Sequence, residues 1–179
     1  MKLTNLIVLG ILVASASAFA QDQAAIDKAL RAAPGNLAKD ATVIKWKADY
    51  TYDTLKKGTN KLVCYDESGL PGEPAFKIEC TSLGNLPRAA QNLKFEAMGA
   101  GKQAALDAAE KDGTRVKPEF GSVWYHLMGA DKDHVRTHMT IAVPGATTAS
   151  MGLPDNGKGG GVWIMNAGTT TAHLMTPGE

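Results

Sequence analysis

Two short apolar segments, each carrying one of the two cysteines of the chain, constrain the fold more than any other sequence feature. Residues 60–66 and 75–82 read as strands, and residues 68–74 between them are rich in Gly and Pro. With the turn in the middle of that stretch, Cys64 falls opposite Cys80, and both lie on the same face of the hairpin. The pattern therefore predicts an antiparallel hairpin closed by a disulfide.

The first twenty residues indicate which compartment the chain is sent to. Lys2 gives a positive head, and residues 6–13 form an apolar core that is too short for an ordinary transmembrane helix. Residues 18–20 have the Ala-x-Ala form that a signal peptidase cuts. A permanent N-terminal anchor is the alternative, but the short core and the adjacent cleavage motif favour removal. The sequence predicts a signal peptide over 1–20 and a mature chain that begins at Gln21.

Export has consequences for the cysteines and for membrane attachment. Paired thiols oxidise in a periplasm or outside the cell, which favours a structural disulfide between Cys64 and Cys80. A redox-active pair is the alternative, although fast dithiol exchange usually uses closer spacing, such as C-x-x-C. There is no cysteine at the cleavage position and no later apolar run of spanning length. We expect a secreted or periplasmic protein with no stable membrane anchor after cleavage.

Charge excludes one class of partner. Removal of residues 1–20 takes away one base and no acid, so 19 basic residues become 18 against 18 acidic residues. Nucleic acid binding requires clustered Lys and Arg, and the densest basic spot is only Lys56-Lys57 beside a turn. A small molecule or another protein is the expected partner.

Hydrophobic periodicity predicts an α+β fold over residues 21–179 as a single domain. We expect an antiparallel sheet with helices packed on one side and one disulfide-linked hairpin. Residues 144–161 are too rich in Gly, Pro and small polar residues for regular structure, and read as a binding flap or a plain surface connection. The other expected elements are helices over 22–33 and 85–111, the second interrupted at Gly99 and Gly101, and strands over 41–47, 123–128, 137–143, 162–167 and 171–175.

Several motifs that are typical of enzymes and of nucleotide or calcium binding are absent from the sequence. There is no G-x-S-x-G elbow, no H-E-x-x-H and no calcium loop, and no phosphate loop precedes a helix. Because triads are defined by geometry, Ser122 or Ser150 with a distant His and Asp remains open as a hydrolase hypothesis.

A series of short segments stands out along the chain: 41–46, 58–60 ahead of Cys64, Cys80 before a helix, 138–139 running to 143–144, 163–169 and 172–175. Taken in this order, the segments resemble a family of small secreted bacterial proteins with no assigned activity. The resemblance implies secretion and a shared fold, and supplies no chemistry. The sequence departs from the family pattern at Thr170-Thr171, where Pro and an aromatic residue are expected.

The histidines are the candidate ligand-binding residues, because all four lie in the C-terminal third of the chain. In strand register His126 lies on the face of Met128, His173 lies on the face of Met175, and His138 lies opposite an apolar face. If strands 137–143 and 171–175 are neighbours, His138 and His173 approach each other, with His126 as a less certain third member. The alternative is a set of ordinary histidines hydrogen-bonded near a core.

These residues lead to one principal reading and two alternatives. The principal reading is a secreted or periplasmic binding or structural module of unknown ligand. Imidazole with thioether suits copper in an extracytoplasmic protein, so a His/Met metal-binding protein is the first alternative. A small secreted hydrolase is the second.

Overall fold

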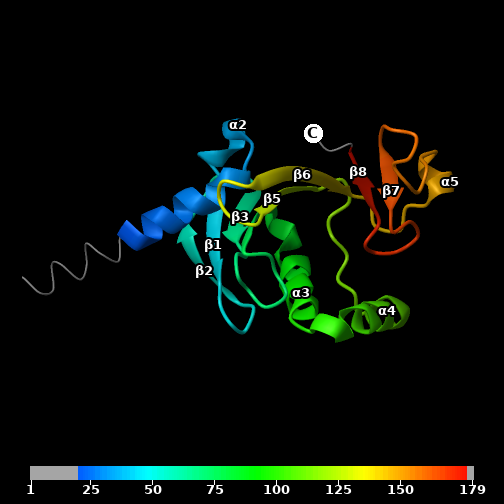
Figure 1. The fold of residues 1–179 in the computed structure, drawn as a ribbon, viewed down its shortest axis with the longest axis horizontal. Helices are drawn as coiled ribbons and strands as arrows, with labels where there is room; N and C mark the ends of the chain where they lie inside the picture. The colour runs from blue at the N-terminus through cyan, green and yellow to red at the C-terminus, as the bar shows by residue number, and fades with distance from the viewer. Residues whose placement is uncertain (1–19, 177–179) are drawn as a thin grey trace, which may run out of the picture.

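The computed structural model describes residues 20–176, and its centre is an eight-stranded sheet in the order β2-β1-β3-β4-β5-β6-β8-β7 (Figure 1). The residues expected to form the signal peptide lie outside the described part of the chain, apart from Ala20. The strands are β1 Thr42–Trp46, β2 Tyr52–Lys56, β3 Leu62–Asp66, β4 Phe76–Ser82, β5 Val123–Gly129, β6 Val135–Ala142, β7 Trp163–Met165 and β8 His173–Met175.

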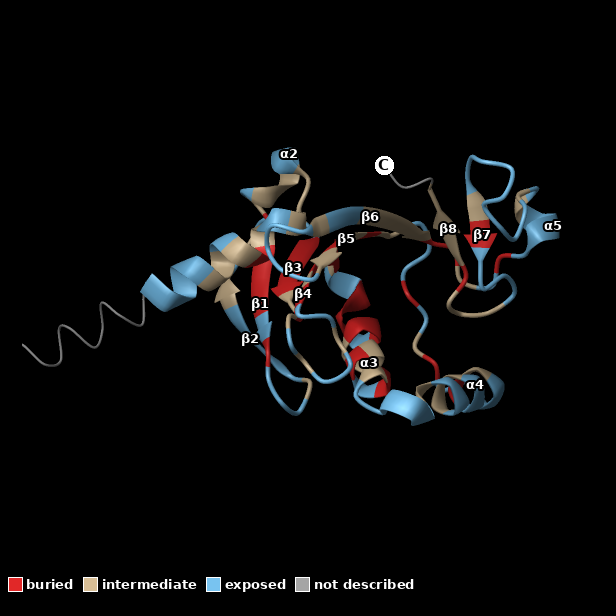
Figure 2. Ribbon diagram, viewed as in Figure 1, coloured by how far each residue is buried: buried red, intermediate tan, exposed pale blue. Residues whose placement is uncertain are grey.

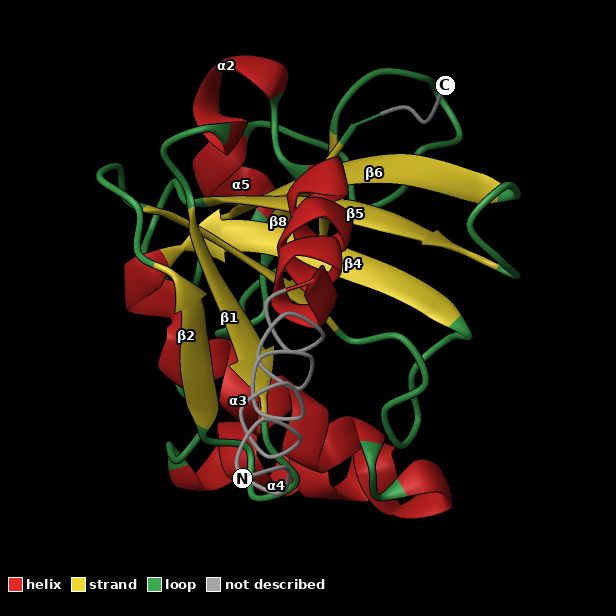
Figure 3. Ribbon diagram, turned by 90° about the vertical axis from the view of Figure 1, so that its left-hand side faces the viewer, coloured by secondary structure: helices red, strands yellow, loops and turns green. Residues whose placement is uncertain are grey.

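The sheet is mainly antiparallel, since only β1 and β3 pair in parallel. This confirms the α+β class and every strand expected from periodicity. Strand β2 was not expected, because most of its side chains are exposed and show no apolar alternation. Figure 3 shows the twist of the sheet, with β1 and β2 running steeply while β4, β5 and β6 cross the view.

The cysteine hairpin forms in the predicted register. Cys64 on β3 pairs directly with Cys80 on β4, and the two sulfur atoms form a disulfide. Both residues are fully buried. The turn position and the period-two alternation of strands were therefore sufficient to predict this bond.

Helical segments connect the strands and border the sheet. Residues 20–29 are helical and continue into a short 3-10 turn, η1. The expected interruption of helix 85–111 occurs at another such turn, η3. The labelled segments are η1 Leu30–Ala32, α2 Gly35–Ala38, η2 Leu83–Asn85, α3 Leu86–Glu96, η3 Gly99–Gly101, α4 Lys102–Asp112 and α5 Thr148–Met151.

Both faces of the sheet are covered. Helix α3 packs on one face, as expected, and the N-terminal helix packs on the opposite face over the disulfide. Buried residues are concentrated in β1, β3, β4 and α3 (Figure 2). The α3 face contains Ile44, Trp46, Val63, Tyr65, Leu86, Ala89, Leu93, Trp124 and Ala142, and the other contains Ala29, Ala41, Val43, Leu62, Cys64 and Cys80.

The expectation that residues 144–161 have no regular structure is wrong at one place. A single helical turn, α5, forms there because Thr147 and Ser150 make a reciprocal capping box. Gly152 ends the turn in the left-handed conformation at φ 65°. Local capping therefore overrides the loop-like composition of this segment.

Within residues 20–176, no helix combines the length and the apolar character needed to cross a membrane.

Candidate functional site

A cavity of about 320 Å³ lies on the α3 face of the sheet and collects three of the four histidines. Strands β5, β6 and β8 supply most of its side chains, and α3 supplies a charged wall. We call it the His cavity. Its lining residues include His126, His138, His173, Met128, Met165, Met175, Arg88, Asn92, Trp124, Thr140, Thr171 and Glu79.

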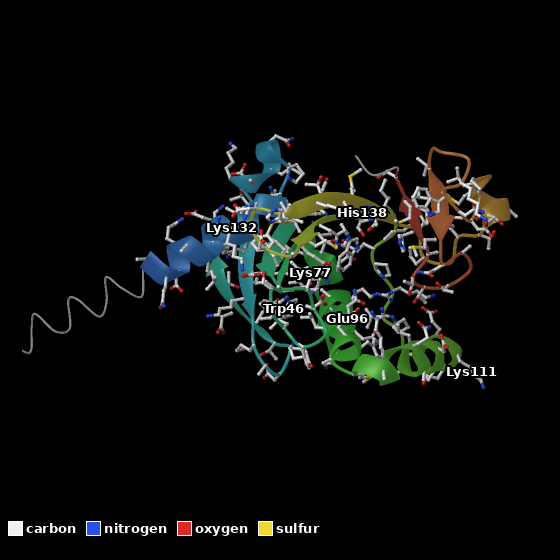
Figure 4. The ribbon with its side chains drawn as sticks, in the orientation of Figure 1. Trp46, Lys77, Glu96, Lys111, Lys132 and His138 are labelled. Atoms are coloured by element: carbon white, nitrogen blue, oxygen red, sulfur yellow. A yellow bond between two sulfur atoms is a disulfide. The ribbon has the colours of Figure 1, made fainter. Side chains whose placement is uncertain are left out.

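Strand pairing explains why these histidines converge. His126 on β5 pairs directly with His138 on β6, and their rings stack with centroids 5.8 Å apart. Strand β8 is the other neighbour of β6, and Ala142 pairs with His173. Strands β6 and β8 are therefore neighbours, which was the condition for His138 and His173 to approach each other. His126, the least certain member in the sequence interpretation, is the direct partner of His138, which is labelled in Figure 4.

His126 is held by a buried carboxylate. Its Nδ1 lies 2.8 Å from Glu79 Oε1, while its Nε2 lies 3.5 Å from Thr140 Oγ1. The Lys77 ammonium and His126 lower the pKa of Glu79 to about 2 against the opposing effect of burial. Because the ionised carboxylate only accepts, Nδ1 of His126 carries a proton and donates it to Glu79, while Nε2 faces the Thr140 hydroxyl. This carboxylate–imidazole pair has the arrangement of a general base.

His173 is also oriented through its Nδ1 atom, in this case by the backbone. Its Nδ1 donates to the Thr171 carbonyl at 2.7 Å, so Nε2 of the neutral ring is free to accept. Burial lowers the pKa of His173. Burial also lowers the pKa of His138, and the neighbouring His126 and His173 lower it further. At pH 7 both rings are therefore neutral and present lone pairs.

Arg88 was not recognised in the sequence, although it is the main charged group of the cavity wall. It sits near the start of α3 and is 3% exposed. Its guanidinium donates to the Val116 carbonyl at 2.5 Å, to Thr170 Oγ1 at 3.3 Å and to Thr171 Oγ1 at 2.7 Å. Thr170 and Thr171 therefore supply the two hydroxyls that hold this arginine.

A buried charge cluster lies behind the cavity on the same sheet face. Lys77 Nζ lies 2.8 Å from both Glu67 and Glu73 and 3.2 Å from Glu79. One ammonium thus faces three carboxylates, and Tyr65 donates a further hydrogen bond to Glu79. Burial and the neighbouring Glu79 raise the pKa of Glu67 well above its usual range, which favours its protonated form. The cluster was missed because Lys77 and Glu79 occupy the alternate positions that read as a solvent-facing side.

Other candidates from the sequence lie away from this cavity. His134 is exposed in the β5–β6 turn and contacts Asp131 at 2.9 Å. Residues 144–161 contribute no side chain to the His cavity, because Met151 and Leu153 pack with the opposite face of β7 and β8.

The serines considered for a hydrolase have other partners. Ser122 Oγ donates to the Glu119 carbonyl at 2.6 Å, and Ser150 Oγ belongs to the capping box of α5. Neither hydroxyl forms a hydrogen bond with a histidine in the described residues.

The cavity meets some requirements of a metal site and lacks others. The three candidate ligands His126, His138 and His173 and three methionines line one cavity, as the copper hypothesis requires. Over residues 20–176, however, no group of three or more His, Cys, Asp or Glu side chains is arranged to hold a metal ion.

Comparisons with protein-family models, curated proteins and solved structures find no match to this chain.

The stacked histidines give a direct test of the site geometry. His126→Gln is expected to raise the pKa of His138, because it removes one of the neighbouring imidazoles that oppose a second positive charge. NMR titration of the imidazole ring signals measures this shift. His134→Gln, an exposed change outside the cavity, is the control and should leave His138 unchanged. An equal His138 pKa in both variants and the wild type would mean that the rings are not in contact.

Proposed function

We propose that the mature chain is a secreted or periplasmic binding protein whose His cavity holds a small molecule. One observation carries the proposal: two histidines of the β5–β6 hairpin and a third from β8, more distant in the sequence, converge on one cavity. The volume of about 320 Å³ lies at the lower end of the range found for small-molecule sites.

The chemistry of the lining supports binding over a purely structural role. Nδ1 of His126 and Nδ1 of His173 are engaged by Glu79 and by a carbonyl, which fixes both ring orientations and leaves Nε2 of His173 available. Methionine sulfurs and Trp124 add apolar surface around these polar groups. A few oriented polar groups in a mainly apolar cavity are typical of ligand sites.

Alanine variants of the histidines test this site. We expect small molecules that bind the wild-type protein to shift the NMR signals of His138 and His173, because both rings line the cavity. Binding should weaken about tenfold or more in His138→Ala or His173→Ala, the cost of roughly one lost hydrogen bond. A library of small polar and aromatic compounds, screened by NMR and followed by calorimetric titration, provides the measurement.

The control variant is His134→Ala, which removes an exposed histidine from the β5–β6 turn, outside the cavity. Ligands whose affinity is unchanged in both cavity variants would contradict the proposal. Copper and zinc ions are titrated alongside. Metal binding tighter than about 10 μM that is lost in both cavity variants would replace the small-molecule proposal with the metal alternative.

The proposed export has its own test. Protein isolated from a secreting host should begin at Gln21, because Ala18-Phe19-Ala20 supplies the small residues that a signal peptidase requires. Intact-mass measurement reads the N-terminus directly. A mass that still includes residues 1–20 would contradict the processing proposal and, with it, the assignment to a periplasmic or extracellular location.

A further inference from the structure

The guanidinium of Arg88 is buried without a carboxylate partner. The residue is 3% exposed, and no Asp or Glu within residues 20–176 lies at ion-pair distance from it. Its three hydrogen bonds go to neutral acceptors, a carbonyl and two hydroxyls. A buried charge is normally paired, because its removal from water is costly and neutral acceptors compensate only in part.

Nearby acids do not fill this role. Glu110 is linked to Arg88 only indirectly, since its carboxylate accepts hydrogen bonds from the same hydroxyls of Thr170 and Thr171. Glu79 lines the cavity but is already paired with Lys77 at 3.2 Å and with His126 at 2.8 Å. Arg88 therefore has no direct carboxylate partner among the described residues, and a negatively charged group that enters the cavity could pair with it.

The donors of Arg88 are also incompletely used. A guanidinium has five N–H groups in a rigid fork. Three hydrogen bonds to the protein leave two N–H groups with no acceptor among the described residues. A planar fork with free donors matches the spacing of two oxygens on one carboxylate or phosphate.

The geometry points to an oxyanion as the ligand of the His cavity, held by Arg88 through a charge-assisted hydrogen-bonded pair. This inference rests on the proposed small-molecule function and narrows it to ligands that carry a carboxylate or a phosphate. Burial and the neighbouring Arg115 lower the pKa of Arg88 to about 9, so the guanidinium is still protonated at pH 7. His173 lines the same cavity, and its Nε2 would accept a hydrogen bond from a hydroxyl or amide group elsewhere on the ligand.

Three probes separate charge from shape. Benzoate and inorganic phosphate carry the two candidate oxyanions, and benzamide has nearly the shape of benzoate without its charge. NMR titration follows the Arg88 Nε–H signal and the ring signals of His138 and His173. We expect saturable shifts with at least one oxyanion, and benzoate binding at least about tenfold tighter than benzamide. Tighter binding of benzoate than of phosphate identifies a carboxylate site, and the reverse identifies a phosphate site.

Matched variants complete the test. Arg88→Gln should weaken binding of the preferred oxyanion about tenfold or more, and Arg88→Lys should recover only part of it, because lysine keeps the charge without the fork. Arg136→Gln makes the same charge change at an exposed position of β6 and should have no effect. If Arg88→Gln does not fold, the comparison of benzoate with benzamide on the wild-type protein still decides the question.

The outcomes distinguish this inference from the proposed function. Benzamide binding as tightly as benzoate, with the same histidine shifts, would overturn the oxyanion inference and leave a small-molecule site in place. Unchanged oxyanion affinity in a folded Arg88→Gln variant would overturn it as well. No saturable shift with any of the three probes up to about 20 mM would overturn the oxyanion inference, while the library screen decides the small-molecule site separately.

Discussion

Lys77→Met is expected to lower the free energy of unfolding by about 3–5 kcal/mol at pH 7, the usual cost of removing one partner from a buried ion pair. The ammonium is the central cation among Glu67, Glu73 and Glu79, at distances of 2.8 to 3.2 Å. Without it, buried carboxylates face one another with no compensating lysine. Urea denaturation at constant temperature measures the loss.

The pH dependence of this loss follows from linkage. Without Lys77, burial and the repulsion between neighbouring carboxylates should raise the folded-state pKa values of Glu67 and Glu73 further above 4.5 than in the wild type. The folded variant then binds more protons than the unfolded chain, so its stability falls as pH rises through that window. In the wild type, the depressed pKa of Glu79 has the opposite effect on stability. The stabilisation that ionised Glu79 contributes is lost as pH falls from about 4.5 toward 2. The difference between the two proteins should be smaller at pH 4 than at pH 7.

The control for this variant is Lys45→Met, which makes the same change at an exposed position on β1. It should alter stability by no more than about 0.5 kcal/mol at either pH. Equal effects of the two substitutions would mean that Lys77 does not hold the carboxylate cluster together.

Loss of the disulfide is the second large effect. Cys64→Ala/Cys80→Ala should lower the free energy of unfolding by about 3 kcal/mol from the loss of the cross-link, with more from the cavity left by two buried sulfurs. The bond closes a loop of sequence separation 16, and both residues are 0% exposed. Equilibrium unfolding of secreted protein and of the double variant gives the difference.

Reduction of the wild-type protein separates the two contributions. A reduced chain loses the cross-link but keeps both sulfur atoms, so it should fall between the oxidised protein and the double variant. Thiol titration of denatured, unreduced protein should find no free thiol. Two free thiols in correctly secreted material would contradict the disulfide.

The histidine site shows what could be predicted from local pattern. Period-two alternation placed His126, His138 and His173 on definite faces of their strands, and the structure keeps those faces. The alternation did not show that His126 pairs with His138. The turn between β5 and β6, which contains the exposed His134, sets which residues of the two strands lie opposite each other.

Arg88 and the Lys77 cluster show where local pattern fails. On β4, Phe76 and Ile78 alternate with Lys77 and Glu79, a pattern typical of a strand with one side in water. Helix α3 covers that second side, and the polar residues are buried there as ion pairs. Arg88 follows Pro87 near the start of a helix, where a charged residue normally faces solvent. Its acceptors Val116, Thr170 and Thr171 come from distant parts of the chain.

The sequence by itself determined the α+β class, the cysteine register and the face of each histidine, because turn residues and side-chain alternation act over a few neighbouring positions. Only the tertiary structure decided which faces meet. The order β5-β6-β8 brings His126, His138 and His173 to one cavity, and α3 closes over the polar side of β4. Pairing between segments far apart in the chain depends on the whole set of competing contacts, so no local pattern encodes it.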